Sequence, residues 1–233
     1  MEFNWGTSIK SQKRARNSKE DDDMSNKKSK TDGYEKTPQN GPPGQNDTFR
    51  EKNHVHFYTG VTTDSVADLQ KLIIDAAKEM RLNVRNASDA GLNVSYNPIV
   101  LHINSFGGSL FAAFSFIGFL AQFKTLYPEI KIRSVIDGYA ASAATLISVA
   151  CDERYITEYG YMLIHQLASA TWGKYHDIKD TISNLDCFMR KIKKIYLQHT
   201  HIKEDDLDDI LKHDLFWDSA KCEELGLVDG VIV

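Results

Sequence analysis

Short apolar segments alternate with longer segments of helical periodicity from residue 54 onward. The short segments have the length of strands and lie at 54–58, 99–104, 130–136, 153–157 and 161–165, with a last one after residue 229. The longer segments are predicted helices and lie at 64–82, 110–127, 146–150, 176–199, 204–211 and 220–225. Because strands and helices alternate, the pattern predicts an α/β fold with a largely parallel sheet.

The pattern also predicts a helix cap, two polar connections and one long amphipathic helix. Thr62 or Thr63 is predicted to cap the first helix, and the polar stretch 83–98 is predicted to be a long loop. Residues 166–173 are predicted to form a polar, β-like segment. The helix at 176–199 carries a broad apolar stripe, which is typical of a core helix or of one that projects to another subunit.

The first 48 residues differ in composition from the rest. They mix basic clusters at 13–16 and 27–30 with an acidic cluster at 20–23 and hold few apolar residues. This composition predicts a disordered charged tail, followed by one folded domain at 49–233. The basic clusters are compatible with a nuclear-localisation or nucleic-acid signal, although a solvated tail is favoured. Met24 is an alternative start.

Charge and cysteine content exclude several classes of protein. The formal net charge of −4 argues against a dedicated nucleic-acid binder. Cys151, Cys187 and Cys222 have neither metal-ligand spacing nor the even number of a disulfide framework, which fits a reducing compartment. No run of eighteen apolar residues and no apolar leader occurs, so a soluble, cytoplasmic protein without a membrane partner is predicted.

Two histidines of the first predicted strand are spaced like metal ligands. His54 and His56 are two residues apart, so they lie on one face of that strand. No third ligand is evident nearby in the sequence, and therefore neither a metal nor a cofactor is predicted.

Residues suited to nucleophilic catalysis follow three of the strands. Ser142 lies among small residues where a strand gives way to a helix, a turn that exposes a serine beside free N–H groups. His165 ends an apolar strand, and the pair Gly107-Gly108 opens another helix. Serine, histidine and aspartate can cooperate as nucleophile, general base and orienting acid, although a serine among small residues is by itself more typical of close helix packing.

Four stretches of this chain together resemble one family. NSFGG at 104–108, GYAASA at 138–143 and MLIHQ at 162–166 are similar to three sequence blocks of the Clp protease proteolytic subunit (ClpP). The segment 214–229, with DLF, SA and ELGLVD, is similar to the closing signature of that family. The resemblance covers about residues 53–233, and its departures indicate a divergent or phage-type member.

The resemblance implies a fold, an activity and roles for particular residues. Ser142 falls on the nucleophile of the family, His165 on the general base and Asp214 on the aspartate that orients the base. The backbone N–H groups of Gly108 and Ala143 match the oxyanion-hole donors. The implied protein is a serine endopeptidase with a crotonase-like ββα spiral fold and a protruding long helix. Its implied partners are unfolded polypeptide substrates, other copies of the chain in heptameric rings, and an AAA+ unfoldase.

Departures from the family pattern keep other interpretations open. Phe106 stands where the family has a proline, and Ala143 stands where it has a methionine. The residues LASA at 167–170 replace a proline and a glycine pair of the family. The usual axial-loop sequence is missing from the N-terminal region. One alternative is a catalytically silent structural ring subunit, which the intact Ser142, His165 and Asp214 argue against. The other is a crotonase-type acyl-CoA enzyme, which shares the glycine-backbone oxyanion hole but needs no triad.

Overall fold

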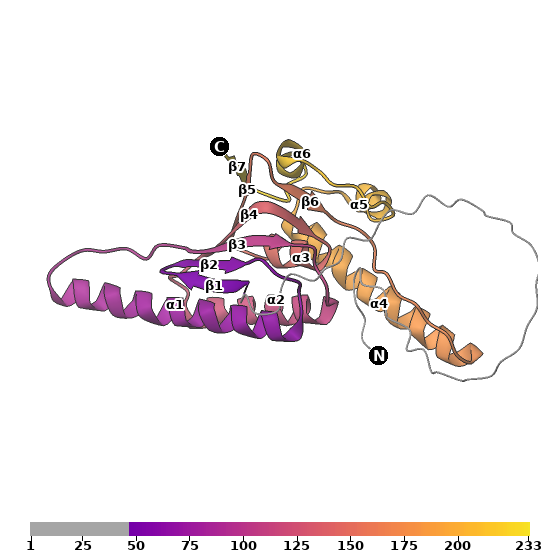
Figure 1. The fold of residues 1–233 in the computed structure, drawn as a ribbon, viewed down its shortest axis with the longest axis horizontal. Helices are drawn as coiled ribbons and strands as arrows, with labels where there is room; N and C mark the ends of the chain where they lie inside the picture. The colour runs from indigo at the N-terminus through magenta and orange to yellow at the C-terminus, as the bar shows by residue number, and fades with distance from the viewer. Residues whose placement is uncertain (1–46) are drawn as a thin grey trace, which may run out of the picture. The chain divides into compact units, whose positions relative to one another are not determined.

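The computed structural model describes residues 47–233, and the strands of this part form one sheet (Figure 1). Its order is β1-β2-β3-β4-β5-β7, and β6 pairs with the last residues of β4. β1 runs antiparallel to β2, and the other strand pairs are parallel. The strands are β1 (Thr48–Glu51), β2 (His54–Phe57), β3 (Ile99–Ser105), β4 (Ile132–Ala141), β5 (Glu153–Thr157), β6 (Tyr161–Leu163) and β7 (Gly230–Ile232).

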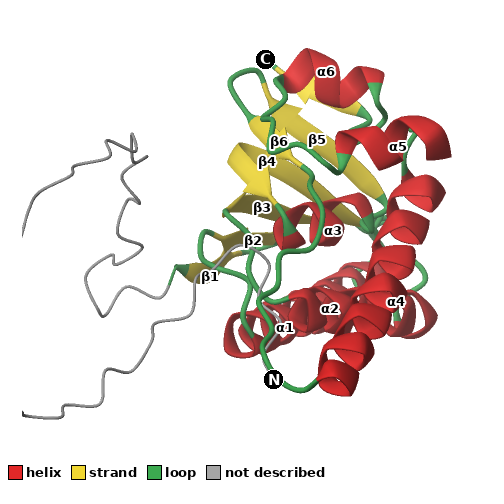
Figure 2. Ribbon diagram, turned by 90° about the vertical axis from the view of Figure 1, so that its right-hand side faces the viewer, coloured by secondary structure: helices red, strands yellow, loops and turns green. Residues whose placement is uncertain are grey.

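Helices connect the parallel strands, as an α/β fold requires. They are α1 (Thr63–Asp89), α2 (Leu110–Leu126), α3 (Ala143–Val149), α4 (Tyr175–His199), α5 (Glu204–Ile210) and α6 (Ser219–Glu224). Helices α1 and α3 pack against the strands, α2 packs on α1 and α3, and α4 packs on α3. Figure 2 shows α2, α3 and α4 on the same side of the sheet. The predicted α/β architecture with a largely parallel sheet is therefore confirmed.

The apolar core lies between the sheet and these helices. On β3 the residues Ile99, Leu101 and Ile103 are fully buried, while His102 between them is only partly buried. The same alternation on β2 buries Val55 and Phe57 and turns the other side chains outward. Because successive side chains of a strand point to opposite faces, the helices cover one face of β2 and β3 and leave polar side chains on the other.

Helix α1 is longer than its pattern predicts. Thr62 caps it by accepting a hydrogen bond from the Ser65 N–H, and the Ser65 hydroxyl accepts one from the Thr62 N–H. The helix then continues through residues 83–89, where the sequence predicts a loop. Exposed asparagine, serine and aspartate cost a helix only a few tenths of a kcal/mol each, so it ends only near Gly91, whose φ is 78°.

Three further differences concern the edges of predicted elements. The hydrophobic pattern does not predict β1, because its four residues, TFRE, hold a single apolar side chain. Residues 166–173 form no strand. β4 continues beyond its predicted end through Gly138 to Ala141, because β3 and β6 supply backbone partners there.

The predicted tail at 1–48 lies outside the described residues, apart from Asp47 and Thr48. Thr48 is buried and begins β1. Between residues 47 and 233, none of the helices combines the length and the apolar character that crossing a membrane requires.

Candidate active site

Ser142 occupies a strained turn between β4 and α3. Its φ and ψ are 58° and −128°, a backbone conformation that residues other than glycine rarely adopt. Its N–H donates to the Leu163 carbonyl over 2.8 Å, so β6 holds the turn in place. Ala141 and Ala143 on either side are buried. Ser142 itself is 2% exposed, so only a small part of it faces solvent.

Two buried hydroxyl groups, of Thr145 and Tyr196, form a chain of hydrogen bonds that supports this turn. The Thr145 hydroxyl donates to the Ser142 carbonyl over 2.6 Å, and the Tyr196 hydroxyl on α4 lies 2.6 Å from the Thr145 oxygen. Because the Thr145 proton is directed at Ser142, Tyr196 is the donor of the second bond. Burial raises the pKa of Tyr196, which keeps that hydroxyl protonated and able to donate. Helix α4 is thereby coupled to the backbone of Ser142.

Replacing Tyr196 by phenylalanine is expected to lower the free energy of unfolding by about 1–2 kcal/mol, because Thr145 loses its buried donor. Thermal unfolding should show a melting temperature lower by roughly 2–8 °C. Tyr175→Phe is the matched control, since Tyr175 is exposed. Equal melting temperatures for the two variants would show that the hydroxyl chain does not stabilise the turn.

His165 and Asp214 complete a hydrogen-bonded line that starts at Ser142. The His165 Nε2 lies 3.1 Å from the Ser142 Oγ, and the His165 Nδ1 lies 2.6 Å from the Asp214 Oδ1. The His165 side chain is 15% exposed and the Asp214 side chain 77% exposed. The three side chains lie 23 and 49 residues apart in sequence, yet each is within hydrogen-bond distance of the next.

Backbone pairing beside β6 brings Asp214 to His165. Met162 and Trp217 exchange both of their backbone hydrogen bonds, of 2.9 and 2.8 Å. The Gln166 N–H donates to the Leu211 carbonyl over 2.7 Å. These bonds hold the segment before and after Asp214 against β6 and the residues that follow it. β6 ends at Leu163, two residues before the predicted end of this strand, so His165 lies just beyond it.

The glycine pair lies directly against Ser142. Gly107 has a φ of 89°, and a Cβ there would come within 2.7 Å of the Ser142 Cβ and 2.9 Å of the Ala143 nitrogen. Two backbone hydrogen bonds fix the turn: the Val61 N–H donates to the Gly107 carbonyl, and the Ser109 N–H donates to the Val61 carbonyl. Neither of these bonds uses the N–H of Gly108. Ala143 begins α3, so its N–H has no acceptor within that helix. These two N–H groups are the predicted oxyanion-hole donors.

Gly107→Ala is expected to lower the rate of the acyl transfer predicted for Ser142 by roughly 10²–10³-fold, because the added methyl group displaces the turn that presents the predicted oxyanion donors. The measurement is kcat/KM on a fluorogenic peptide. Gly118→Ala is the matched control, since a Cβ at Gly118 in α2 meets nothing within 4 Å. Full activity of Gly107→Ala would contradict a role for this turn.

Comparisons with known proteins show the family of this chain and its fold. A sequence model described as Clp protease matches residues 90–233. The chain belongs to the Clp protease family. Among solved structures, a point mutant of ClpP1 from Listeria monocytogenes superposes with a TM-score of 0.62. That match has 17% sequence identity and covers 78% of this chain and 91% of that chain, so it shows a common fold.

The predicted site residues of this Clp protease family member lie close together in the structure. The structure brings together Ser142, His165 and Asp214, and it places the Gly107 turn beside the serine. The support from Tyr196 and Thr145 is not predicted from the sequence. One signal for it exists: Tyr196 follows Ile192 by four residues on the apolar stripe of α4, and a buried tyrosine in such a stripe needs a partner for its hydroxyl.

Proposed function

We propose that this Clp protease family member is a serine endopeptidase that cleaves unfolded polypeptides within an oligomeric chamber. The observation that carries the proposal is the continuous line from the Ser142 Oγ through the His165 imidazole to the Asp214 carboxylate. A hydroxyl, an imidazole and a carboxylate in this order form the nucleophile, base and orienting acid of acyl transfer.

The proposed reaction follows from these contacts. The Ser142 Oγ attacks a peptide carbonyl and passes its proton to the His165 Nε2, 3.1 Å away. Asp214 accepts the Nδ1–H of His165, which fixes the ring and stabilises the imidazolium. The N–H groups of Gly108 and Ala143 donate to the oxyanion. His165 then protonates the leaving amine, and water attacks the acyl-enzyme with His165 as the base.

The surface beside this site supports a peptide substrate. Phe106 precedes the glycine pair, is 54% exposed, and its ring lies 4.0 Å from that of Tyr139. The exposed Phe106 ring, packed on the partly buried Tyr139, offers an apolar wall for a substrate side chain.

Exposed apolar side chains support assembly into rings, and heptamers are the proposed form. Ile182 in α4 is 51% exposed, and before the helix Trp172 and at its start Tyr175 are 93% and 66% exposed. The first half of α4 thus carries an apolar surface that a second copy of the chain can bury. An AAA+ unfoldase as partner and a cytoplasmic location belong to the same proposal.

Labelling with a fluorophosphonate probe tests the nucleophile. We expect the purified full chain to be labelled and Ser142→Ala to remain unlabelled. Ser148→Ala is the matched control, because Ser148 is a fully buried serine of the same helix that pairs with Ser134. No labelling of assembled protein would favour a silent ring subunit, and coenzyme A binding would favour the crotonase-type alternative.

A further inference from the structure

A cluster of polar side chains on the helix-free face of the sheet takes no part in the proposed peptidase chemistry. His56 on β2 is the register partner of His102 on β3, and Asp137 on β4 lies beside them. One ligand atom from each of these three side chains can be chosen so that all lie within 4.8 Å of one another. The three come from strands far apart in sequence, so only the sheet brings them together.

The two histidine rings of this cluster lie face to face. The rings of His56 and His102 stack with centroids 4.6 Å apart and an interplanar angle of 11°. Neutral imidazoles keep a lone pair for a metal ion, whereas imidazolium does not.

Asp137 supplies the negative charge. Both of its carboxylate oxygens lie 3.0 Å from the His102 Nδ1. The Tyr58 hydroxyl donates to the same carboxylate and lies 3.1 Å from the His56 Nδ1.

We propose that His56, His102 and Asp137 bind a divalent transition-metal ion such as Zn²⁺. Two imidazole nitrogens and one carboxylate oxygen form a donor set that Zn²⁺ prefers, and water or the Tyr58 oxygen completes four-coordination. In the sequence, His54 and His56 have metal-like spacing, but no third ligand lies near them. The parallel sheet supplies His102 and Asp137.

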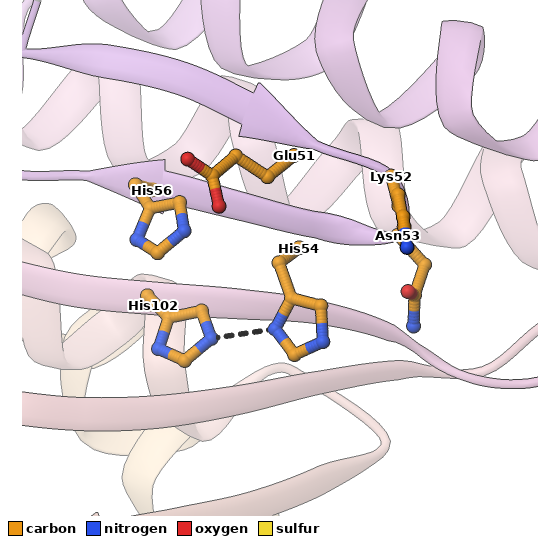
Figure 3. Close-up of a pocket in the computed structure, with 6 residues that line it drawn as sticks. All are labelled: Glu51, Lys52, Asn53, His54, His56 and His102. Atoms are coloured by element: carbon orange, nitrogen blue, oxygen red, sulfur yellow. Dashed lines mark hydrogen bonds between the residues drawn. The ribbon is translucent and has the colours of Figure 1, made fainter.

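His54 acts as the outer partner of this site. Its Nδ1 lies 2.9 Å from the His102 Nε2, as the dashed line in Figure 3 marks. When His102 carries its hydrogen on Nε2 and donates it to His54, the Nδ1 lone pair beside Asp137 becomes free for the metal. Such partners orient ligating histidines in most metal sites.

An ion can reach the site from solvent. An open pocket of about 510 Å³ lies beside the histidines, lined by Glu51, Lys52, Asn53, His54, His56 and His102. Figure 3 shows the three imidazoles side by side with the Glu51 carboxylate near them. The bound ion would tie β2, β3 and β4 together across the face that the helices leave open.

Titration calorimetry of the full chain, without a histidine tag and after treatment with a chelator, tests the proposal with ZnCl₂ and with CoCl₂. One ion per chain is expected to bind, and Co²⁺ should give the visible absorption bands of a nitrogen- and oxygen-ligated site. His56→Ala and Asp137→Asn should abolish binding, and His54→Ala should weaken it by about 10–100-fold. His176→Ala is the matched control, because His176 is exposed and lies outside the cluster.

A second readout separates metal binding from misfolding of a variant. With Zn²⁺ at about 100 times its Kd, the melting temperature of the wild type should rise by roughly 5–10 °C. It should not rise for Asp137→Asn, whose isosteric side chain keeps the sheet intact. The proposal is overturned if the wild type binds neither ion, or if both ligand variants bind as tightly as His176→Ala. Neither readout depends on peptidase activity.

Discussion

Ser142→Ala is expected to lower kcat/KM for a fluorogenic peptide by roughly 10⁴–10⁶-fold, because the variant loses the attacking oxygen and therefore the acyl-enzyme pathway. The oligomeric state should remain that of the wild type. Within residues 47–233, Ser142 makes its structural hydrogen bonds through its backbone N–H and carbonyl, and its side chain is hydrogen-bonded to His165. Size-exclusion chromatography with light scattering checks the assembly.

Two results would contradict the first expectation in different ways. Disassembly of Ser142→Ala would identify Ser142 as a packing residue of the turn. Retained hydrolysis would mean that another group attacks the peptide. Ser148→Ala is again the control, and it should keep both its activity and its assembly, since the Ser148 hydroxyl pairs with Ser134 away from His165.

Asp214→Asn is expected to lower kcat by about 10²–10⁴-fold, because an amide can donate to the His165 Nδ1 and so favour the tautomer that carries its hydrogen on Nε2. In that tautomer His165 cannot accept the proton of Ser142. The upper end of the range is that of a buried aspartate. Asp214 is 77% exposed here, so water can replace part of its effect.

Steady-state kinetics of Asp214→Asn beside Asp209→Asn measure this effect. Asp209 is a suitable control because it is 73% exposed and its ion-pair partner is Lys212, away from His165. A change of less than about threefold in Asp214→Asn would show that the carboxylate does not set the tautomer of His165. A fall in KM alone would likewise contradict an orienting role.

The elements of this fold were predictable where local pattern and local chemistry agree. β5 occurs at the predicted residues, and α4 differs by one residue at its start. The extension of α1 through 83–89 was not predictable, because an exposed polar stretch suits a loop and a helix almost equally. β1 was not predictable either, because it is a strand through its pairing with β2 and not through the pattern of its own four side chains.

The sequence by itself determined which residues can do the chemistry. Small residues around Ser142, a histidine at the end of a strand and a glycine pair before a helix are local features, and their order along the chain identified the family. These features are readable because each depends on a few neighbouring residues and on the backbone conformations that those residues allow.

Only the tertiary structure decided which side chains meet. Asp214 reaches His165 because Trp217 pairs with Met162, and Tyr196 reaches Thr145 because α4 packs on α3. The cluster of His56, His102 and Asp137 likewise exists only through the register of three parallel strands. Contacts between residues distant in sequence depend on the packing of whole elements, which no local pattern encodes.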